Sequence, residues 1–95
     1  MSDDSDKLAD LRRQIDALDD ELLQLLAKRM DHVREVGQYK KSHNLPPLDA
    51  ERWQSVLATR LAEAQKLGLS DEFVTQLYQL VHEYALSIEA AIEPS

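Results

Sequence analysis

Two basic residues, Arg29 and Lys40, lie on an apolar helical stripe, and this placement constrains the chain more than any other feature of its sequence. The stripe repeats every three or four residues, the spacing of one face of a long helix, through Leu8, Leu11, Ile15, Leu18, Leu22, Leu25 or Leu26, Val33 and Val36. At about 100° per residue, Arg29 projects in nearly the same direction as Leu11, and Lys40 within roughly 20° of it. Burying a lone cation is costly unless an anion meets it. The pattern therefore predicts either paired carboxylates of the protein or an anionic ligand.

The bulk composition limits the class of protein. With 95 residues, two glycines, three prolines and 43% hydrophobic residues, residues 1–95 are expected to form a single helical domain. The net charge of −7 argues against nucleic acid and anionic membranes as partners. The chain has no membrane-spanning apolar run and an acidic beginning unlike a signal peptide, so we expect a cytoplasmic protein. Without cysteine, and with histidines that lack metal-site spacing, no metal site is expected.

Three helices are predicted. The first runs from about Ser5, its expected N-cap, to Ser42, and its pattern continues through Gly37 until two prolines in the segment 43–47 stop it. Asp49 caps a second helix that ends at Gly68. The third helix begins at Ser70. It has one apolar stripe of Phe73, Leu77, Leu80, Tyr84, Ile88 and Ala91, and a second of Val74, Tyr78, Val81 and Ala85, with Glu89 following on it.

The length of the first helix predicts a partner. A helix of roughly 38 residues is about 55 Å long, whereas a compact chain of this size has a radius of gyration of about 12–13 Å. The two shorter helices cannot cover it alone. We therefore expect a helical homodimer in which the first helix packs against its antiparallel copy, the alternative being a plain coiled coil.

A third basic residue extends the cationic stripe. Lys40 lies about 16 Å along the helix from Arg29, whereas Arg12 lies about 25 Å away, too far to share a small ligand within one chain. In an antiparallel dimer, Arg12 of the partner would meet Arg29. A guanidinium grips a carboxylate through two parallel hydrogen bonds, so the spacing predicts a small dicarboxylate as the ligand.

Four stretches of the sequence closely resemble the all-helical chorismate mutase family. They are Leu11-Arg12-Arg13-Gln14-Ile15-Asp16-Ala17-Leu18-Asp19, Leu25-Leu26-Ala27-Lys28-Arg29, Val36-Gly37-Gln38-Tyr39-Lys40 and Asp49-Ala50-Glu51-Arg52. The resemblance covers nearly the whole chain and matches the family's spacing of cations without a gap. It implies an all-α, intertwined antiparallel homodimer of three-helix chains. It also implies the conversion of the dicarboxylate chorismate to prephenate in aromatic amino acid biosynthesis.

The resemblance assigns roles to five residues of the first and second helices. It places Arg12 of the partner chain and Arg29 on the substrate carboxylates. Lys40 would reach the enol ether oxygen and a carboxylate. Asp49 and Arg52 match the motif that opens the second helix, where they would shape and order the pocket wall.

Three further positions concern the ether oxygen and the ring. Glu89 falls where the family has Gln or Glu, which donates a hydrogen bond to the ether oxygen, and a carboxyl group donates only when protonated. Trp53 stands where many members have a Glu that contacts the ring hydroxyl, and Ala85 where many have a small hydroxyl residue. Both departures affect the ring end of the pocket. Because the rearrangement is pericyclic, no nucleophile and no cofactor are expected.

Three of these residues also have a structural interpretation that involves no ligand. Arg29 would then pair with Asp16, Asp19 or Glu89. Lys40 would be a solvated lysine favoured by the helix dipole. Asp49 would act as a helix cap only.

Other functions are compatible with the same residues. Isochorismate–pyruvate lyases share the fold and the cations but lack the Glu at the position of Trp53. An amino-substituted chorismate mutase would also fit the altered ring contact. The non-enzymatic alternative is a helical dimerisation module with a dead pocket, which the retained cations disfavour. We expect no feedback control within this chain, because its length leaves no separate regulatory domain.

Overall fold

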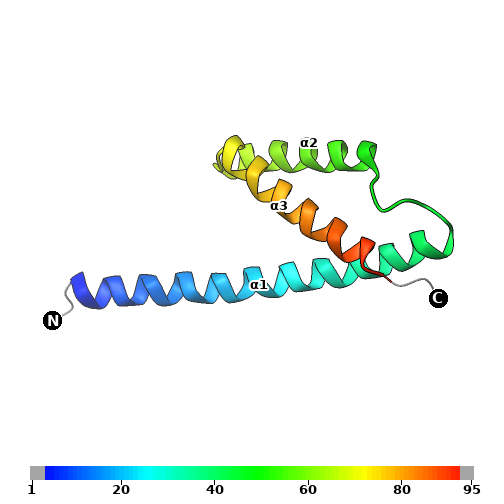
Figure 1. The fold of residues 1–95 in the computed structure, drawn as a ribbon. Helices are drawn as coiled ribbons and strands as arrows, with labels where there is room; N and C mark the ends of the chain where they lie inside the picture. The colour runs from blue at the N-terminus through cyan, green and yellow to red at the C-terminus, as the bar shows by residue number, and fades with distance from the viewer. Residues whose placement is uncertain (1–3, 93–95) are drawn as a thin grey trace. The chain divides into compact units, whose positions relative to one another are not determined.

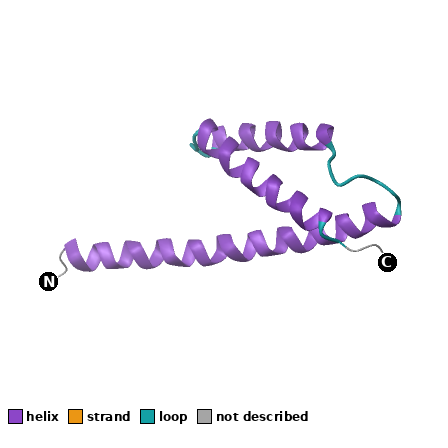
Figure 2. Cartoon of the chain, viewed as in Figure 1, coloured by secondary structure: helices purple, strands orange, loops and turns teal. Residues whose placement is uncertain are grey.

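The computed structural model of the protein describes residues 4–92, which form three helices joined by turns and loops (Figure 1). They are α1 (Asp4–Ser42), α2 (Ala50–Lys66) and α3 (Asp71–Ala90). No strand occurs within residues 4–92 (Figure 2), so the predicted all-α class with one very long first helix is confirmed. The chain divides into two units, Met1–His32 and Val33–Ser95, which are described separately below.

The start of α1 differs from the prediction by one residue. Asp4 is already helical, so Ser5 lies inside the first turn and is not the N-cap; that prediction was wrong. A serine side chain favours the N-cap of a helix, but this preference is weak enough that the helix extends past Ser5. Residues 1–3, part of the acidic stretch that argued against a signal peptide, lie outside the described range.

α1 and α2 are terminated in the same way, by a residue with left-handed backbone two positions after the last helical residue. Asn44 has φ 57° and Gly68 has φ 77°. In each case the next residue folds back: Leu45 N donates to Lys40 O at 2.8 Å, and Leu69 N donates to Ala64 O at 2.9 Å. This is the Schellman arrangement, which satisfies carbonyls of the last helical turn. α1 therefore ends at Ser42 and the chain turns away at Asn44, before the first of the two prolines that predicted the end of the helix.

The predicted cap of the second helix is confirmed, and Ser70, predicted to open the third helix, is its N-cap. Asp49 Oδ1 accepts a hydrogen bond from Arg52 N at 3.0 Å at the start of α2. Ser70 Oγ accepts one from Phe73 N at 3.2 Å at the start of α3. Each side chain satisfies a backbone donor that the helix itself leaves without an acceptor.

In the unit Val33–Ser95, α2 and α3 pack against each other. Its buried apolar side chains are Ala64 of α2 and Val74, Val81 and Ala85 of α3. Only the second predicted stripe of α3 is therefore buried, whereas Phe73, Leu80 and Tyr84 of the first stripe are more than half exposed. In a single chain, α3 is covered on one side.

In the unit Met1–His32, the apolar stripe of α1 faces solvent. Six of its side chains are 45–62% exposed, namely Leu8, Leu11, Ile15, Leu18, Leu22 and Leu25. Met30, at the end of this unit, is buried. No helix within residues 4–92 has the length and apolar character to cross a membrane.

Candidate active site

Lys40 and Glu89 meet in an ion pair between the last turn of α1 and the last turn of α3. Lys40 Nζ lies 2.9 Å from Glu89 Oε1, and both residues belong to the unit Val33–Ser95. The side chain of Lys40 is 19% exposed and that of Glu89 only 9%. A pair this well covered is screened less by water and salt than a surface pair. The structure thus brings together two of the residues that the sequence assigned to the site.

A backbone carbonyl holds the ammonium group from a second direction. Lys40 Nζ donates to Pro47 O at 2.6 Å, and the Lys40 carbonyl accepts from Leu45 N. Both the side chain and the main chain of Lys40 are thereby tied to the α1–α2 linker. Glu89 Oε1 is buried, and among residues 4–92 no donor is aligned for a hydrogen bond with it, so its attraction to the nearby ammonium is mainly electrostatic. Lys40 is thus held in place, and the alternative of a freely solvated lysine is excluded.

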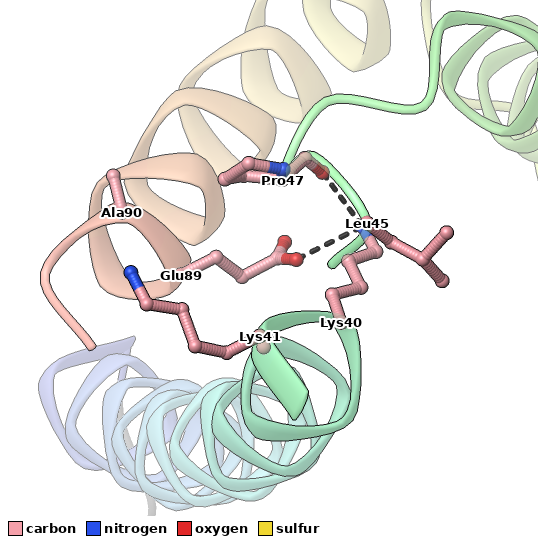
Figure 3. Close-up of a pocket in the computed structure, with 7 residues that line it drawn as sticks. Lys40, Lys41, Leu45, Pro47, Glu89 and Ala90 are labelled. Carbon is pink, nitrogen blue, oxygen red and sulfur yellow. Dashed lines mark hydrogen bonds and ion pairs between the residues drawn. The ribbon is translucent and has the colours of Figure 1, made fainter. Parts of the chain in front are cut away.

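The pair borders a small pocket of about 230 Å³. Figure 3 shows the two dashed contacts, from Pro47 and from Glu89, converging on the ammonium of Lys40, while the Lys41 amine points away from the Glu89 carboxylate. Two lysines and one glutamate leave one positive charge in excess. The lining consists of Gly37, Lys40, Lys41, Leu45, Pro47, Glu89 and Ala90.

Arg29 lies in the other unit, Met1–His32, and is half-buried. Its Nη1 atom is buried and has no hydrogen-bond partner among residues 4–92. The predicted alternative of an ion pair with Asp16 or Asp19 is not found in this part of the chain, and Glu89 is paired with Lys40. A buried guanidinium nitrogen without an acceptor is costly, which makes Arg29 suited to receive an anion.

The other predicted site residues do not line this pocket. Arg12 is exposed on α1, and Asp49 and Arg52 are exposed at the start of α2. Trp53 is half-buried and stacks on His82 of α3, with ring centroids 4.0 Å apart. Ala85 is buried, one turn before Glu89. A single chain therefore assembles the Lys40–Glu89 part of the predicted site.

Sequence reasoning missed five of the lining residues. Lys41 was assigned no role in the sequence analysis, and the side chains of Leu45, Pro47 and Ala90 carry no functional group that would mark them. Pro47 contributes its backbone carbonyl, which no side-chain motif reveals. Gly37 carried a usable signal, because a glycine inside a helix often marks a close approach. Among residues 4–92 no group of His, Cys, Asp and Glu side chains is arranged to hold a metal ion.

A very long first helix that ends in a cation, and a third helix that delivers a buried carboxylate to it, define an all-helical protein with a small, cation-lined pocket. The chain belongs to the chorismate mutase type II family, whose family model matches residues 11–90. The predicted family resemblance is therefore confirmed.

The relatives of the chain fall into two groups by length. The T-protein of Haemophilus influenzae is 46% identical over 67 residues, which make up 70% of this chain and 18% of that protein. The bifunctional chorismate mutase/prephenate dehydratase of Escherichia coli is 33% identical over 82 residues, 86% of this chain and 21% of that protein. The isochorismate pyruvate lyase of Pseudomonas aeruginosa is 36% identical over 83 residues, 86% of this chain and 81% of that protein. The chain thus spans about a fifth of the length of its T-protein relatives.

Proposed function

We propose that this protein is a chorismate mutase, an isomerase that converts chorismate to prephenate in aromatic amino acid biosynthesis. Family membership supports this function. The structural observation that carries it is the Lys40–Glu89 pair, which sets a fixed cation and a carboxyl group side by side in a pocket. A cytoplasmic location remains a prediction.

The rearrangement has two requirements, and the residues of this pocket meet one of them. The substrate must be held in its compact diaxial form, and negative charge must be stabilised on the ether oxygen as its C–O bond breaks. Lys40 answers the second need, because Pro47 O and Glu89 hold its ammonium in place before any substrate arrives. Glu89, once protonated, would donate to the same oxygen. A fixed donor needs little reorganisation during the reaction.

We infer that the active form is an antiparallel homodimer in which the partner's Arg12 completes the site. Three observations support this inference. The stripe of α1 and one stripe of α3 are exposed in the single chain, as a contact surface would be. The pocket of about 230 Å³ is smaller than most ligand sites. Its single excess positive charge does not balance a dicarboxylate, so Arg29 and the partner's Arg12 are assigned to the carboxylates.

A second candidate is isochorismate–pyruvate lyase activity. It is supported by the Pseudomonas relative of that name, which matches this chain over most of both lengths. It is also supported by Trp53, which takes the place of a Glu that many mutases carry and packs on His82. Loss of that contact alters recognition of the ring substituent, and the lyase differs from the mutase in this part of its substrate.

Identification of the products tests both candidates. The purified protein is offered chorismate and isochorismate separately, and the Lys40→Ala variant serves as the control for a contaminating enzyme. Efficient formation of prephenate supports the mutase. Formation of salicylate and pyruvate from isochorismate, with slow turnover of chorismate, assigns the lyase. Turnover of neither by the wild-type protein contradicts both, and an amino-substituted chorismate is then the next substrate to offer.

A further inference from the structure

Gly37 is a buried glycine inside α1, one turn before Lys40. Glycine in a helix interior is less stable than alanine by about 1 kcal/mol. A positive φ would justify this cost, but Gly68 is the glycine with a positive φ in the described chain. The backbone conformation at position 37 therefore suits any residue. The reason for glycine has to lie in the space around it.

That space is taken by the end of α3. A Cβ atom at position 37 would lie 3.1 Å from Glu89 Cγ and 3.3 Å from Glu89 Cα, and would overlap the Cδ1 atom of Ile92. Ile92 Cδ1 is the tip of a flexible side chain and can turn away. Glu89 Cα belongs to the main chain, so it can yield only if α3 moves. The two helices thus approach at Glu89 as closely as the missing side chain allows.

We propose that Gly37 is a positioning residue that sets the Glu89 carboxylate against the Lys40 ammonium. Positions 37 and 40 are neighbours on one helix face. Glu89 therefore rests its main chain on Gly37 and extends its carboxylate to Lys40 Nζ, 2.9 Å away. A methyl group at position 37 displaces α3 by a few tenths of an ångström at the residue that carries the carboxylate. The catalytic meaning of this role rests on the proposed function, whereas its geometric meaning does not.

The geometric part is tested without substrate. Lysine ammonium groups are observed by ¹⁵N-edited NMR when they are held and protected from exchange, and the Lys40 signal is identified by its loss in Lys40→Ala. In Gly37→Ala we expect this signal to shift strongly or to vanish. The matched control is Gly68→Ala, which strains a left-handed turn but meets open space. It should lose stability and keep the Lys40 signal. An unchanged Lys40 signal in folded Gly37→Ala overturns the proposal.

Two further measurements cover the case in which Gly37→Ala does not fold. The variant Gly37→Ala/Ile92→Ala removes the side-chain overlap and keeps the approach to Glu89, so it should show the same loss of the Lys40 signal. In the wild-type protein, the Hα protons of Gly37 should give cross-relaxation peaks with the Hα and Hγ protons of Glu89. Absence of these peaks from an assigned wild-type spectrum contradicts the close approach directly.

The catalytic part is tested by a double-mutant cycle on turnover. We expect Gly37→Ala to lower kcat by about tenfold with little change in KM, because small displacements of a catalytic group are costly. In a Glu89→Ala background the same change should have no further effect on kcat, since its target is gone. Independent, multiplicative effects would show that Gly37 acts through packing alone. Should the wild-type protein turn over neither substrate, the proposed function fails, and the NMR result still decides the role of Gly37.

Discussion

The indole of Trp53 lies almost parallel to the imidazole of His82, with ring centroids 4.0 Å apart and an angle of 9° between the ring planes. Trp53 comes from the first turns of α2 and His82 from the middle of α3, so the stack joins the two helices of the hairpin. The family resemblance placed Trp53 at the ring end of the substrate pocket. In the structure its ring has a partner within the chain, which gives the residue a packing role whatever it does for a ligand.

The stack is expected to contribute to the stability of the packed α2 and α3 helices. We expect Trp53→Ala to lower the free energy of unfolding by about 2 kcal/mol, because a large half-buried ring loses its contacts. His82→Ala should cost less, and the double-mutant cycle should give a coupling energy of about 1 kcal/mol, measured by urea unfolding. Strict additivity of the two changes would mean that the rings do not interact in solution.

Lys40 should be far more sensitive to substitution than another helix-terminal lysine. Lys40→Ala removes the cation proposed to stabilise the ether oxygen, and we expect kcat/KM to fall by about 10²–10³-fold, as for loss of one fixed transition-state donor. Lys66 lies in the last turn of α2 and is exposed, so Lys66→Ala serves as the charge-matched control. Equal losses in the two variants would point to a general effect of charge and not to the pocket.

Glu89 is proposed to donate a hydrogen bond to the ether oxygen. Glutamine keeps the length of the side chain and carries an amide N–H donor, whereas alanine removes the donor. We therefore expect Glu89→Gln to keep a kcat close to that of the wild-type protein and Glu89→Ala to lower kcat by about 10²-fold. The comparison is made with initial rates at saturating substrate. Equal kcat values in the two variants would remove Glu89 from the role of donor.

The two N-caps offer a matched pair that separates capping from site function. Asp49→Ala and Ser70→Ala each remove one side-chain acceptor for a backbone N–H, and we expect each to lower the free energy of unfolding by about 1 kcal/mol. If Asp49 also orders the pocket wall, Asp49→Ala alone should raise KM. Equal KM values in the two variants would leave Asp49 as a cap only.

The contribution of Arg12 across the dimer is tested by mixing two inactive variants. Chains with Arg12→Ala and chains with Lys40→Ala are unfolded together, refolded and assayed. If Arg12 serves the partner's site, half of the dimers are mixed and each has one intact site, so about a quarter of wild-type activity should return. No recovery is expected if Arg12 acts within its own chain. Each variant refolded alone is the control.

Much of the fold was predictable because it depends on local signals. Asp49 and Ser70 precede helical patterns as caps do, and Gly68 can take a left-handed backbone without strain. The end of α1 was predicted at the right position but for the wrong reason. The prediction relied on the two prolines, whereas the residue that turns the chain is Asn44. Its left-handed backbone leaves a weaker signal in the sequence than a proline does.

The site was predictable only where side-chain type reveals chemistry. Lys40 was identified as a site residue because a cation is unexpected on the apolar stripe of the first helix. Glu89 was identified because it follows the second apolar stripe of the third helix. Their direct pairing was not foreseen, since Glu89 was offered as a partner for Arg29. The stack on His82 and the carbonyl of Pro47 depend on how α2, α3 and the linker meet, and no periodicity in one segment contains that information.

The Glu89 carboxylate beside Lys40 lowers the affinity of the pocket for an anionic ligand while supplying a group proposed to speed the reaction. It cancels one of the two lysine charges around the pocket, so a dianion must displace an internal competitor before it gains the full attraction of Lys40. Removing Glu89 would double the excess positive charge and favour tight capture of substrate and product alike, while removing the proposed donor. A high turnover rate favours the weaker affinity for the dianion, because a product that dissociates slowly keeps the next substrate molecule out of the pocket.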